Sequence, residues 1–522
     1  MTRTAAHEQR PSDPASTRIA LALIGAFALA RLALDASLGL GADEAYTVAV
    51  SRRLTLSYFD HPPLHQWLAH YSALAFGEGV WVRLPFIALF AVTGWLLYAL
   101  TRELFGLSAA LWALFGLNAS AFFFASAGGW VVPDGCLLLA LAAAALVLAK
   151  LFFGEPDSAA IWRLWLAAGF WLGLAGLSKY TAVFPAIGLV LFMLLAKRRR
   201  PWFAHPAPYA GALLTLVLIA PVFLWNYNNG WVSFVFQGGR GASDGGLRPD
   251  HVATIIVGQV ALLTPWIFVA LLGGLVAAAR RARADERRLF LLCLAAPAIL
   301  VFTLTPLWSA RGLPHWPMPG WFFAFPLAGA WVADGWARRF DMRRWAFGAC
   351  AALAVIAALF VAQAHTGWIT QWGLLPAATV DPTIETLDWS ALRNSPLFSA
   401  QRPAFIVSVK WSDAGKIALA LGPQTPVLIY SDDPRGIAFL DRPANHLGQD
   451  GVIIAPKFKR DFVYAVLAPY FDSLGPAQEI AVERGGRPEI PLVLIPARGL
   501  TRPWPLPYPR QALAARPSLE TP

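Results

Sequence analysis

The sequence predicts a polytopic α-helical membrane protein with a small α/β domain at its carboxy-terminal end. Of the 522 residues, 57% are hydrophobic and only 14% are Asp, Glu, Lys or Arg, and the mean hydropathy is +0.53. A soluble protein of this composition could not cover its surface with polar atoms. Apolar runs of membrane-crossing length recur between residues 19 and 364. These observations exclude a soluble enzyme, a disordered chain, a fibrous repeat and a disulfide scaffold.

The apolar runs are long enough for about eleven membrane crossings, because a helix needs about 20 apolar residues to cross the hydrocarbon core. The first run is expected to be retained as a span, since no small-residue cleavage site stands out after it. The predicted crossings are approximately 19–38, 81–100, 107–127, 135–153, 161–177, 180–196, 209–224, 253–278, 289–304, 318–333 and 345–364. Cys136, Cys293 and Cys350 fall inside these runs and are predicted to be packing residues.

The positive charge of the chain follows the crossings. The net charge is +11, and the basic residues concentrate in clusters at 197–200, 280–288 and 338–344, between apolar runs. With residues 1–18 as a cytoplasmic tail, all three clusters fall on the cytoplasmic side, as the positive-inside bias requires. An odd number of crossings then places the carboxy terminus outside. No separate basic domain with interleaved aromatic residues exists, so we expect membrane lipids rather than nucleic acid as partners.

The composition changes after the last crossing. Short β-rich runs at 404–409, 426–430, 452–454 and 492–495 alternate with Asp, Gly and Pro turns, and a helix is expected near 413–421. The stretch 502–522 is rich in proline and is expected to have little regular structure. We therefore divide the chain into a cytoplasmic tail (1–18), a transmembrane domain (19–365) whose first external loop is 39–80, and an extracytoplasmic α/β domain (366–522).

Charged residues that do not serve as cytoplasmic anchors collect on the outer side of the predicted membrane. Because charged groups near a bilayer are costly, such residues are candidates for a functional site. They are Asp43, Glu44, Asp60 and His61 in the first external loop, and Asp134, Lys179, Arg240, Arg311 and His315 in later ones.

Each candidate has more than one interpretation. Asp43 and Glu44 are predicted near a helix amino terminus, where the helix dipole favours an ionised carboxylate. Such a carboxylate can act as a base, bind a divalent cation or simply cap the helix. Lys179 and Arg240 can extend to lipid headgroups or pair with phosphate oxygens. Taken together, these cations and acids on one side of the membrane predict a site for an anionic, lipid-linked substrate.

Several of these residues stand in short stretches that resemble a known family. The stretches are Asp43-Glu44-Ala45-Tyr46, Asp60-His61-Pro62-Pro63-Leu64, Pro133-Asp134, 176–181 and His315-Trp316-Pro317. They look like the signatures of the polyprenyl-phosphate-dependent glycosyltransferases of family 39. This family contains bacterial relatives of protein O-mannosyltransferases and of the lipid A aminoarabinose and galacturonic acid transferases. The resemblance covers roughly residues 19–364.

The resemblance implies a GT-C fold, a sugar donor carried on a polyprenyl phosphate, and Asp43 as the catalytic residue. The chain has Asp60-His61 where the aminoarabinose branch carries Glu-Lys before the two prolines. His61 can replace that lysine only as a protonated ring or as a neutral hydrogen-bond donor. No cofactor is required, although Glu44, Asp60 and Asp134 leave a divalent metal as an option.

We therefore expect an inverting sugar transfer at the periplasmic face of a bacterial inner membrane. Asp43 would act as base, and Lys179 and Arg240, with His61 or Arg311, would hold the donor phosphate. Glu44, placed with Asp43 in the catalytic pair, would, like Asp60 and Asp134, orient the acceptor or the sugar or hold a divalent metal. The acceptor would be lipid A or lipopolysaccharide, another envelope glycan or lipid, or a protein. A transporter or lipid flippase is the alternative, but it would place ionisable residues near the membrane midplane, often at broken helices. A scaffold with a sensing domain would not explain the acidic first loop.

Overall fold

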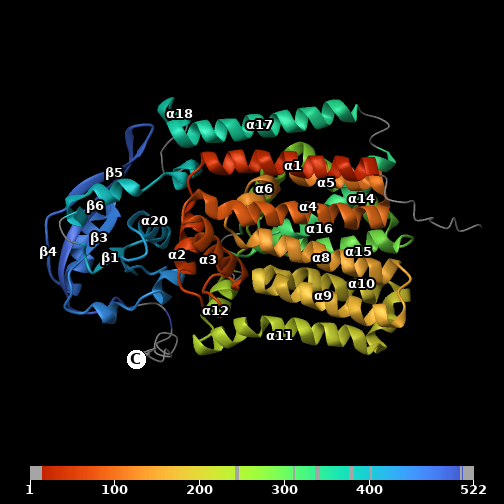
Figure 1. Ribbon diagram of the computed structural model, residues 1–522, viewed down its shortest axis with the longest axis horizontal. Helices are drawn as coiled ribbons and strands as arrows, with labels where there is room; N and C mark the ends of the chain where they lie inside the picture. The colour runs from red at the N-terminus through yellow and green to blue at the C-terminus, as the bar shows by residue number, and fades with distance from the viewer. Residues whose placement is uncertain are drawn as a thin grey trace, which may run out of the picture.

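The computed structural model describes residues 14–240, 246–309, 312–335, 341–374, 381–399, 402–505 and 508. A bundle of long helices carries a β-sheet domain at one end (Figure 1). Among the described residues, seven helices are long and apolar enough to cross a membrane, and up to ten spans result if each of three sharply bent helix pairs counts as one. The prediction of a polytopic helical membrane protein with a carboxy-terminal α/β domain is confirmed.

The long helices run along the bundle. Because no water reaches the hydrocarbon core, the backbone of each span must satisfy its own hydrogen bonds, which only a helix achieves within one segment. α11 packs against α9, α9 against α8, and α8 against α4. The seven helices are α1 (Pro14–Ser37), α4 (Leu84–Phe105, continuing the turn η1, Val80–Arg83), α8 (Pro133–Phe153), α9 (Ser158–Ser178), α11 (Pro206–Asn228), α15 (Glu286–Leu304) and α17 (Met342–Thr366).

Three other predicted crossings are bent. α5 (Leu107–Asn118) turns by 81° into α6 (Ala121–Phe124) and α7 (Ser126–Gly129), and η2 (Tyr180–Ala182) with α10 (Val183–Leu195) turns by 110° into the basic η3 (Lys197–Ala204). The crossing predicted at 253–278 is two helices, α13 (Pro249–Leu263) and α14 (Pro265–Arg281), which meet at 106°. Thr264 between them has a φ of 65°, and Pro265 lacks the N–H that a continuous helix needs.

α16 (Met318–Asp334) corresponds to the crossing predicted at 318–333. It is buried along almost its whole length, against α5, α14 and α15. The first external loop folds into α2 (Ala42–Ser51) and α3 (Leu64–Phe76), and α12 (Val232–Gly239) follows α11. All of these elements except α16 lie toward the sheet end of the bundle, where Figure 1 shows α2 and α3 beside the sheet domain.

The carboxy-terminal domain is built on a mixed sheet. Its strands are β1 (Phe405–Ser408), β2 (Val427–Ile429), β3 (Gly451–Pro456), β4 (Phe471–Leu474), β5 (Gln478–Arg484) and β6 (Arg487–Leu500), in the order β2-β1-β3-β6-β4, with β5 also paired to β6. β1 runs parallel to β2 and β3, while β6 runs antiparallel to β3, β4 and β5. The predicted β-rich runs correspond to β1, β2, β3 and part of β6, and the predicted helix to α20 (Trp411–Leu421).

Short helical turns complete the domain. They are α18 (Trp368–Gln371), η7 (Pro382–Thr386), η8 (Ser390–Asn394), α19 (Pro396–Ser399), η9 (Arg435–Phe439), η10 (Pro443–His446), η11 (Lys457–Lys459), α21 (Arg460–Phe462), η12 (Val463–Leu467) and η13 (Ala468–Tyr470); η4 (Thr305–Leu307) belongs to the bundle.

The sheet domain is held directly on the first external loop. α20 approaches α2 so closely that a Cβ on Gly415 would lie 2.6 Å from the backbone nitrogen of Tyr46. The ammonium group of Lys416 donates hydrogen bonds to the carbonyl oxygens of Leu40 and Leu387, and Arg52 donates to the carbonyl of Ala418 at 2.8 Å. These contacts fix the ends of β1 and β2 next to the loop that carries Asp43.

Candidate active site

Asp43 lies in the first turn of α2, and its carboxylate is open to water. Among the described residues it makes no hydrogen bond or ion pair. Protein atoms nevertheless surround it on most sides, and this desolvation raises its pKa above the usual range, although the charges of Arg435, Arg240 and Lys179 lower it in part. An accessible, unpaired carboxylate with a raised pKa is well suited to accept a proton.

Glu44, the neighbour of Asp43 in sequence, has the opposite environment. It is buried, and its oxygens pair with Arg83 at 2.5 and 2.8 Å and accept the backbone N–H groups of Gly41 and Val131 at 2.8 and 3.0 Å. Burial alone would raise the pKa of Glu44, but Arg83 and the two N–H groups lower it overall. The predicted catalytic role of Glu44 does not fit this geometry, because its oxygens are already bound; the geometry fits a positioning role.

Arg83 links this carboxylate to the end of the first span. Its guanidinium donates to the carbonyl oxygens of Asp35, Leu38 and Gly39 at 2.7 to 2.9 Å. The Glu44–Arg83 pair therefore fixes the start of α2, and with it Asp43, relative to α1. No sequence signal singles out Arg83, because it lies inside a predicted crossing with no motif around it.

Asp60 is buried and lies within electrostatic reach of Asp43, Arg240 and Arg435. We call the region between Asp43, Asp60, Lys179, Arg240 and Arg435 the chamber. Its Oδ2 accepts a hydrogen bond from the hydroxyl of Tyr46, which itself accepts the N–H of Gly436 at 2.8 Å. Its Oδ1 has no hydrogen-bond partner and lies 3.8 Å from Nη1 of Arg435. Burial raises the pKa of Asp60 to about 6, against the opposing charge of Arg435.

Arg435 and Trp411 come from the sheet domain and were not predicted. The guanidinium carbon of Arg435 lies 3.7 Å from the centre of the Trp411 ring, and that ring packs edge-on against Tyr46 at 5.3 Å between centres. Trp411 follows β1 and Arg435 follows β2, two adjacent parallel strands. The carboxyl ends of parallel strands are where ligands bind in open α/β sheets, and this is the signal that could have found them.

Two predicted cations line the other side of the chamber. Nζ of Lys179, directly after α9, lies 2.9 Å from both carboxylate oxygens of Asp134 at the start of α8, and both side chains are buried. Lys179 therefore does not extend to headgroups. Arg240 follows α12, and its guanidinium lies over the rings of Phe236 and Trp316 at 4.5 and 5.6 Å. No described carboxylate pairs with Arg240.

The two predicted histidines are neutral. His61 is enclosed by protein, and burial together with the nearby charges of His65, Lys179 and Arg240 lowers its pKa well below the usual value. Burial also lowers the pKa of His315 to about 4, and its ring stacks on Phe122. Of the two options for His61, the neutral hydrogen-bond donor is thus favoured. Arg311, the remaining predicted site residue, lies outside the described residues.

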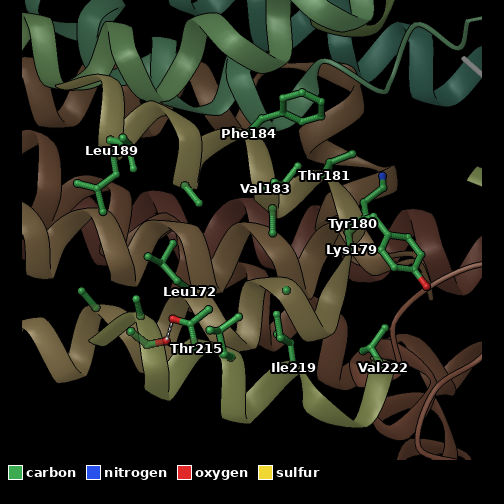
Figure 2. A pocket seen from close by; sticks show the side chains of 18 of the residues that line it. Leu172, Lys179, Tyr180, Thr181, Val183, Phe184, Leu189, Thr215, Ile219 and Val222 are labelled. Carbon is green, nitrogen blue, oxygen red and sulfur yellow. Dashed lines mark hydrogen bonds between the residues drawn. The ribbon is translucent and has the colours of Figure 1, made fainter. Parts of the chain in front are cut away.

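A cavity of about 1010 Å³ opens from this chamber between α9, α10 and α11. Figure 2 shows Lys179 and Tyr180 at one end and Leu172, Leu189 and Thr215 farther along it. We call this cavity the groove. Its lining is almost entirely apolar; the polar rim consists of His61, Lys179, Gln237, Arg240 and Trp316, and the far end of Trp202, Phe203 and Tyr209.

The structure thus brings most of the predicted site residues into one region. Asp43, Asp60, His61 and His315 each lie within electrostatic reach of Arg240, and Asp134 is joined to the region through Lys179. Within the described part of the chain, no three Asp, Glu, His or Cys side chains come together as a metal site.

Parts of this chain are similar to known glycosyltransferases. Residues 60–225 match the family model described as dolichyl-phosphate-mannose-protein mannosyltransferase. The lipid A galacturonosyltransferase RgtD of Rhizobium johnstonii (strain DSM 114642 / LMG 32736 / 3841) is 25% identical over 300 residues, which are 56% of this chain. The match spans 60% of the length of that relative.

The fold as a whole is similar to a solved structure. The crystal structure of ArnT from Cupriavidus metallidurans bound to undecaprenyl phosphate superposes with a TM-score of 0.63 at 17% identity, covering 92% of this chain and 97% of that one. Its structure in the apo state gives the same TM-score. The resemblance to GT-C polyprenyl-phosphate-dependent glycosyltransferases, drawn from the motifs, is confirmed.

Proposed function

We propose that this GT-C membrane protein is an inverting glycosyltransferase that uses a polyprenyl-phosphate sugar donor at the periplasmic face of a bacterial inner membrane. One observation carries the proposal: the unpaired carboxylate of Asp43 lies within electrostatic reach of Lys179 and Arg240, which belong to the polar rim of an apolar groove. A sugar donor has a lipid tail, a phosphate and a sugar, which match the apolar groove, the cationic rim and the Asp43 carboxylate in that order.

The groove suits the isoprenoid tail. It lies between three membrane-embedded helices, and nearly all of its lining is apolar, so a hydrocarbon chain would exchange lipid contacts for protein contacts at little cost. The similarity to the ArnT fold, which was crystallised with undecaprenyl phosphate, supports this use of the groove.

The rim suits the phosphate. Arg240 has no carboxylate partner among the described residues, Lys179 has one ammonium group to share between Asp134 and a ligand, and neutral His61 can donate a hydrogen bond. Hydrogen-bond donors and cations placed where negative charge develops stabilise the transition state. As the bond between the anomeric carbon and the phosphate oxygen breaks, the electron pair leaves with the phosphate, which these groups would stabilise.

Asp43 supplies the base. The acceptor hydroxyl attacks the anomeric carbon opposite the departing phosphate, which inverts the configuration, and its proton passes to the Asp43 carboxylate. A positioned base of this kind contributes a rate factor of about 10² to 10⁴. Because the phosphate leaves as a stable anion, the reaction needs no strong general acid and no cofactor, although a divalent metal is compatible with it.

The acceptor belongs to the cell envelope. Lipid A or lipopolysaccharide, another glycan or lipid, and a protein are the candidates, and the 25% identity with a lipid A galacturonosyltransferase favours lipid A. The orientation inferred from the basic clusters places the sheet domain in the periplasm, next to such acceptors.

The test is sugar transfer in proteoliposomes with defined polyprenyl-phosphate sugars, read out as the mass added to lipid A. We expect sugar transfer by the wild type and a large loss of transfer in Asp43→Asn. The control Asp461→Asn, whose carboxylate is 95% exposed in the sheet domain, should keep full activity. Full activity of Asp43→Asn would refute the assignment of Asp43 as the base. Movement of lipid across the bilayer without transfer would favour the flippase alternative.

A further inference from the structure

Arg435 occupies a backbone position that an arginine rarely adopts. Its φ is 46°, in the left-handed region where a side chain meets the backbone and glycine is preferred. Residues held in such conformations concentrate at functional sites, where the surrounding structure maintains them. Here the following N–H group, of Gly436, is bound to Tyr46 of the first external loop. The contact between the two domains thus holds the turn that presents Arg435.

The guanidinium of Arg435 is held in a defined orientation. One face lies on the ring of Trp411 at 3.7 Å, and Nε donates to Asp433 at 3.3 Å. The side chain is only 19% exposed. An arginine oriented in this way has already lost most of its rotamer freedom, so it binds a ligand at lower entropic cost.

Most of the hydrogen-bonding capacity of Arg435 is unused. Apart from Nε, none of its N–H groups has an acceptor among the described residues. The carboxylate oxygen of Asp60 nearest to Nη1 is 3.8 Å away and is itself unpartnered. Buried polar groups are normally satisfied, so the unpartnered Oδ1 of Asp60 calls for an explanation. The two terminal nitrogens of a guanidinium match the paired oxygens of a carboxylate or phosphate.

Arg435 is separate from the cations at the groove. Lys179 and Arg240 line the groove and Arg435 does not. The ring of Phe236 lies near both guanidinium groups, 4.5 Å from that of Arg240 and 5.7 Å from that of Arg435. Asp43 is within electrostatic reach of both arginines. With the donor phosphate at the rim, Arg435 would therefore face the transferred sugar or the acceptor.

We propose that Arg435, oriented by Trp411 and Asp433, binds a second anionic oxygen group of the substrates, beyond the phosphate that links the donor sugar to its lipid. That group is the carboxylate of a uronic acid sugar on the donor or a phosphate on the acceptor. The inference rests on the proposed function and makes the sheet domain part of the specificity site.

The experiment compares matched substrates with the full-length protein in proteoliposomes at a fixed pH of 8. Donors are a polyprenyl-phosphate hexuronic acid and the neutral hexose of the same configuration; acceptors are lipid A with and without its phosphates. The variants are Arg435→Gln, Arg435→Lys and Arg435→Gly, the last of which removes the side chain while suiting the left-handed backbone. Arg498→Gln, exposed on β6, is the control.

We expect Arg435→Gln and Arg435→Gly to lower kcat/KM about 10- to 100-fold for the substrate that carries the second anionic group. The matched neutral substrate should change by no more than about twofold, and Arg435→Lys should retain part of the preference. A loss confined to the uronic donor identifies the sugar carboxylate, and a loss confined to phosphorylated lipid A identifies the acceptor phosphate. An equal loss with all substrates, or no loss, would overturn the inference. Absence of transfer by the wild type with every pair would instead refute the proposed function, and this inference with it.

Discussion

The groove and the neighbouring chamber differ in the groups they offer to a ligand. The groove is lined mainly by three successive helices, α9, α10 and α11, and apolar surface makes up nearly all of its lining. The chamber joins Asp43 and Asp60 of the first loop to Arg240 and to Arg435 of the sheet domain. The groove offers a large apolar surface whose contacts do not orient a ligand, whereas the chamber offers a few charged groups in fixed positions that can.

This difference predicts how each region responds to substitution. Apolar binding is worth about 25 cal/mol per Å² and is shared among many side chains, so one truncation in the groove has a small effect. A charged group that touches the reacting atoms acts alone, and its loss is not compensated. The following substitutions test that contrast, from the largest expected effect to the smallest.

Asp43→Asn should cause the largest loss in activity. The amide cannot accept the proton, so kcat should fall by about 10² to 10⁴ with little change in KM. Single-turnover transfer in proteoliposomes measures this, with the folded fraction of each variant checked by size-exclusion chromatography. A drop in kcat of less than tenfold would contradict the assignment of the base.

Arg83→Leu should cause the largest loss in stability. It leaves Glu44 buried without its partner, which costs about 3 to 5 kcal/mol in the free energy of unfolding. The matched control is Lys457→Leu, whose pair with Glu479 is about half exposed, at 48 and 54%, and is expected to contribute at most about 1 kcal/mol. Thermal unfolding in detergent compares the two. Equal destabilisation would show that the Glu44–Arg83 pair does not anchor α2.

Lys179→Met should weaken donor binding about tenfold, because one of the groups that face the donor phosphate is lost. Asp134→Asn is combined with it so that no unpaired charge stays buried. Lys197→Met, in the predicted cytoplasmic cluster, is the control and should leave the donor KM unchanged. Similar KM values for the two variants would argue against the phosphate site at the rim.

As the pH is lowered, activity should begin to fall at a higher pH than it would if the base had the pKa of a free aspartate. The base must be ionised, and burial raises the pKa of Asp43 and that of Asp60 to about 6, against about 3.9 for a free aspartate. As the pH is lowered, the rate should therefore decline at a higher pH than the pKa of a free aspartate would give. A profile of kcat/KM from pH 4.5 to 8.5 that stays flat below pH 5.5 would contradict this.

Leu172→Ala in the groove should have the smallest effect, a rise of about two- to fivefold in the donor KM, since it removes one of many apolar contacts. Leu166→Ala on the same helix is the control, because Leu166 is exposed and does not line the groove. A rise in the donor KM as large as that of the Lys179 variant would show that binding in the groove depends on single side chains.

The two regions also differ in how far the sequence predicts them. The walls of the groove follow from hydropathy, because each is a continuous apolar segment, and the motifs single out Asp43, Lys179 and Arg240. Hydropathy alone does not reveal the bend at Thr264, although Pro265 after it is a local signal that a helix can break there. The sequence does not predict β4 and β5, because apolar and polar residues do not alternate regularly along them.

The sequence does not predict those contacts of the chamber that join segments far apart in the chain. The contact between Tyr46 and Gly436 connects residues 390 apart, and only the docking of α20 on α2 brings Arg435 to Asp60. Glu44 and Asp43 look equivalent in the sequence. Their roles separate because Arg83, at the end of the same loop, occupies one carboxylate and leaves the other free.

The most direct test of the account is a structure of the full chain with a non-transferable polyprenyl-phosphonate sugar. We predict that the lipid tail occupies the groove between α9, α10 and α11, that the phosphonate contacts Arg240 and Lys179, and that the Asp43 carboxylate faces the anomeric carbon. A tail bound elsewhere on the bundle, or an anomeric carbon out of reach of Asp43, would contradict it.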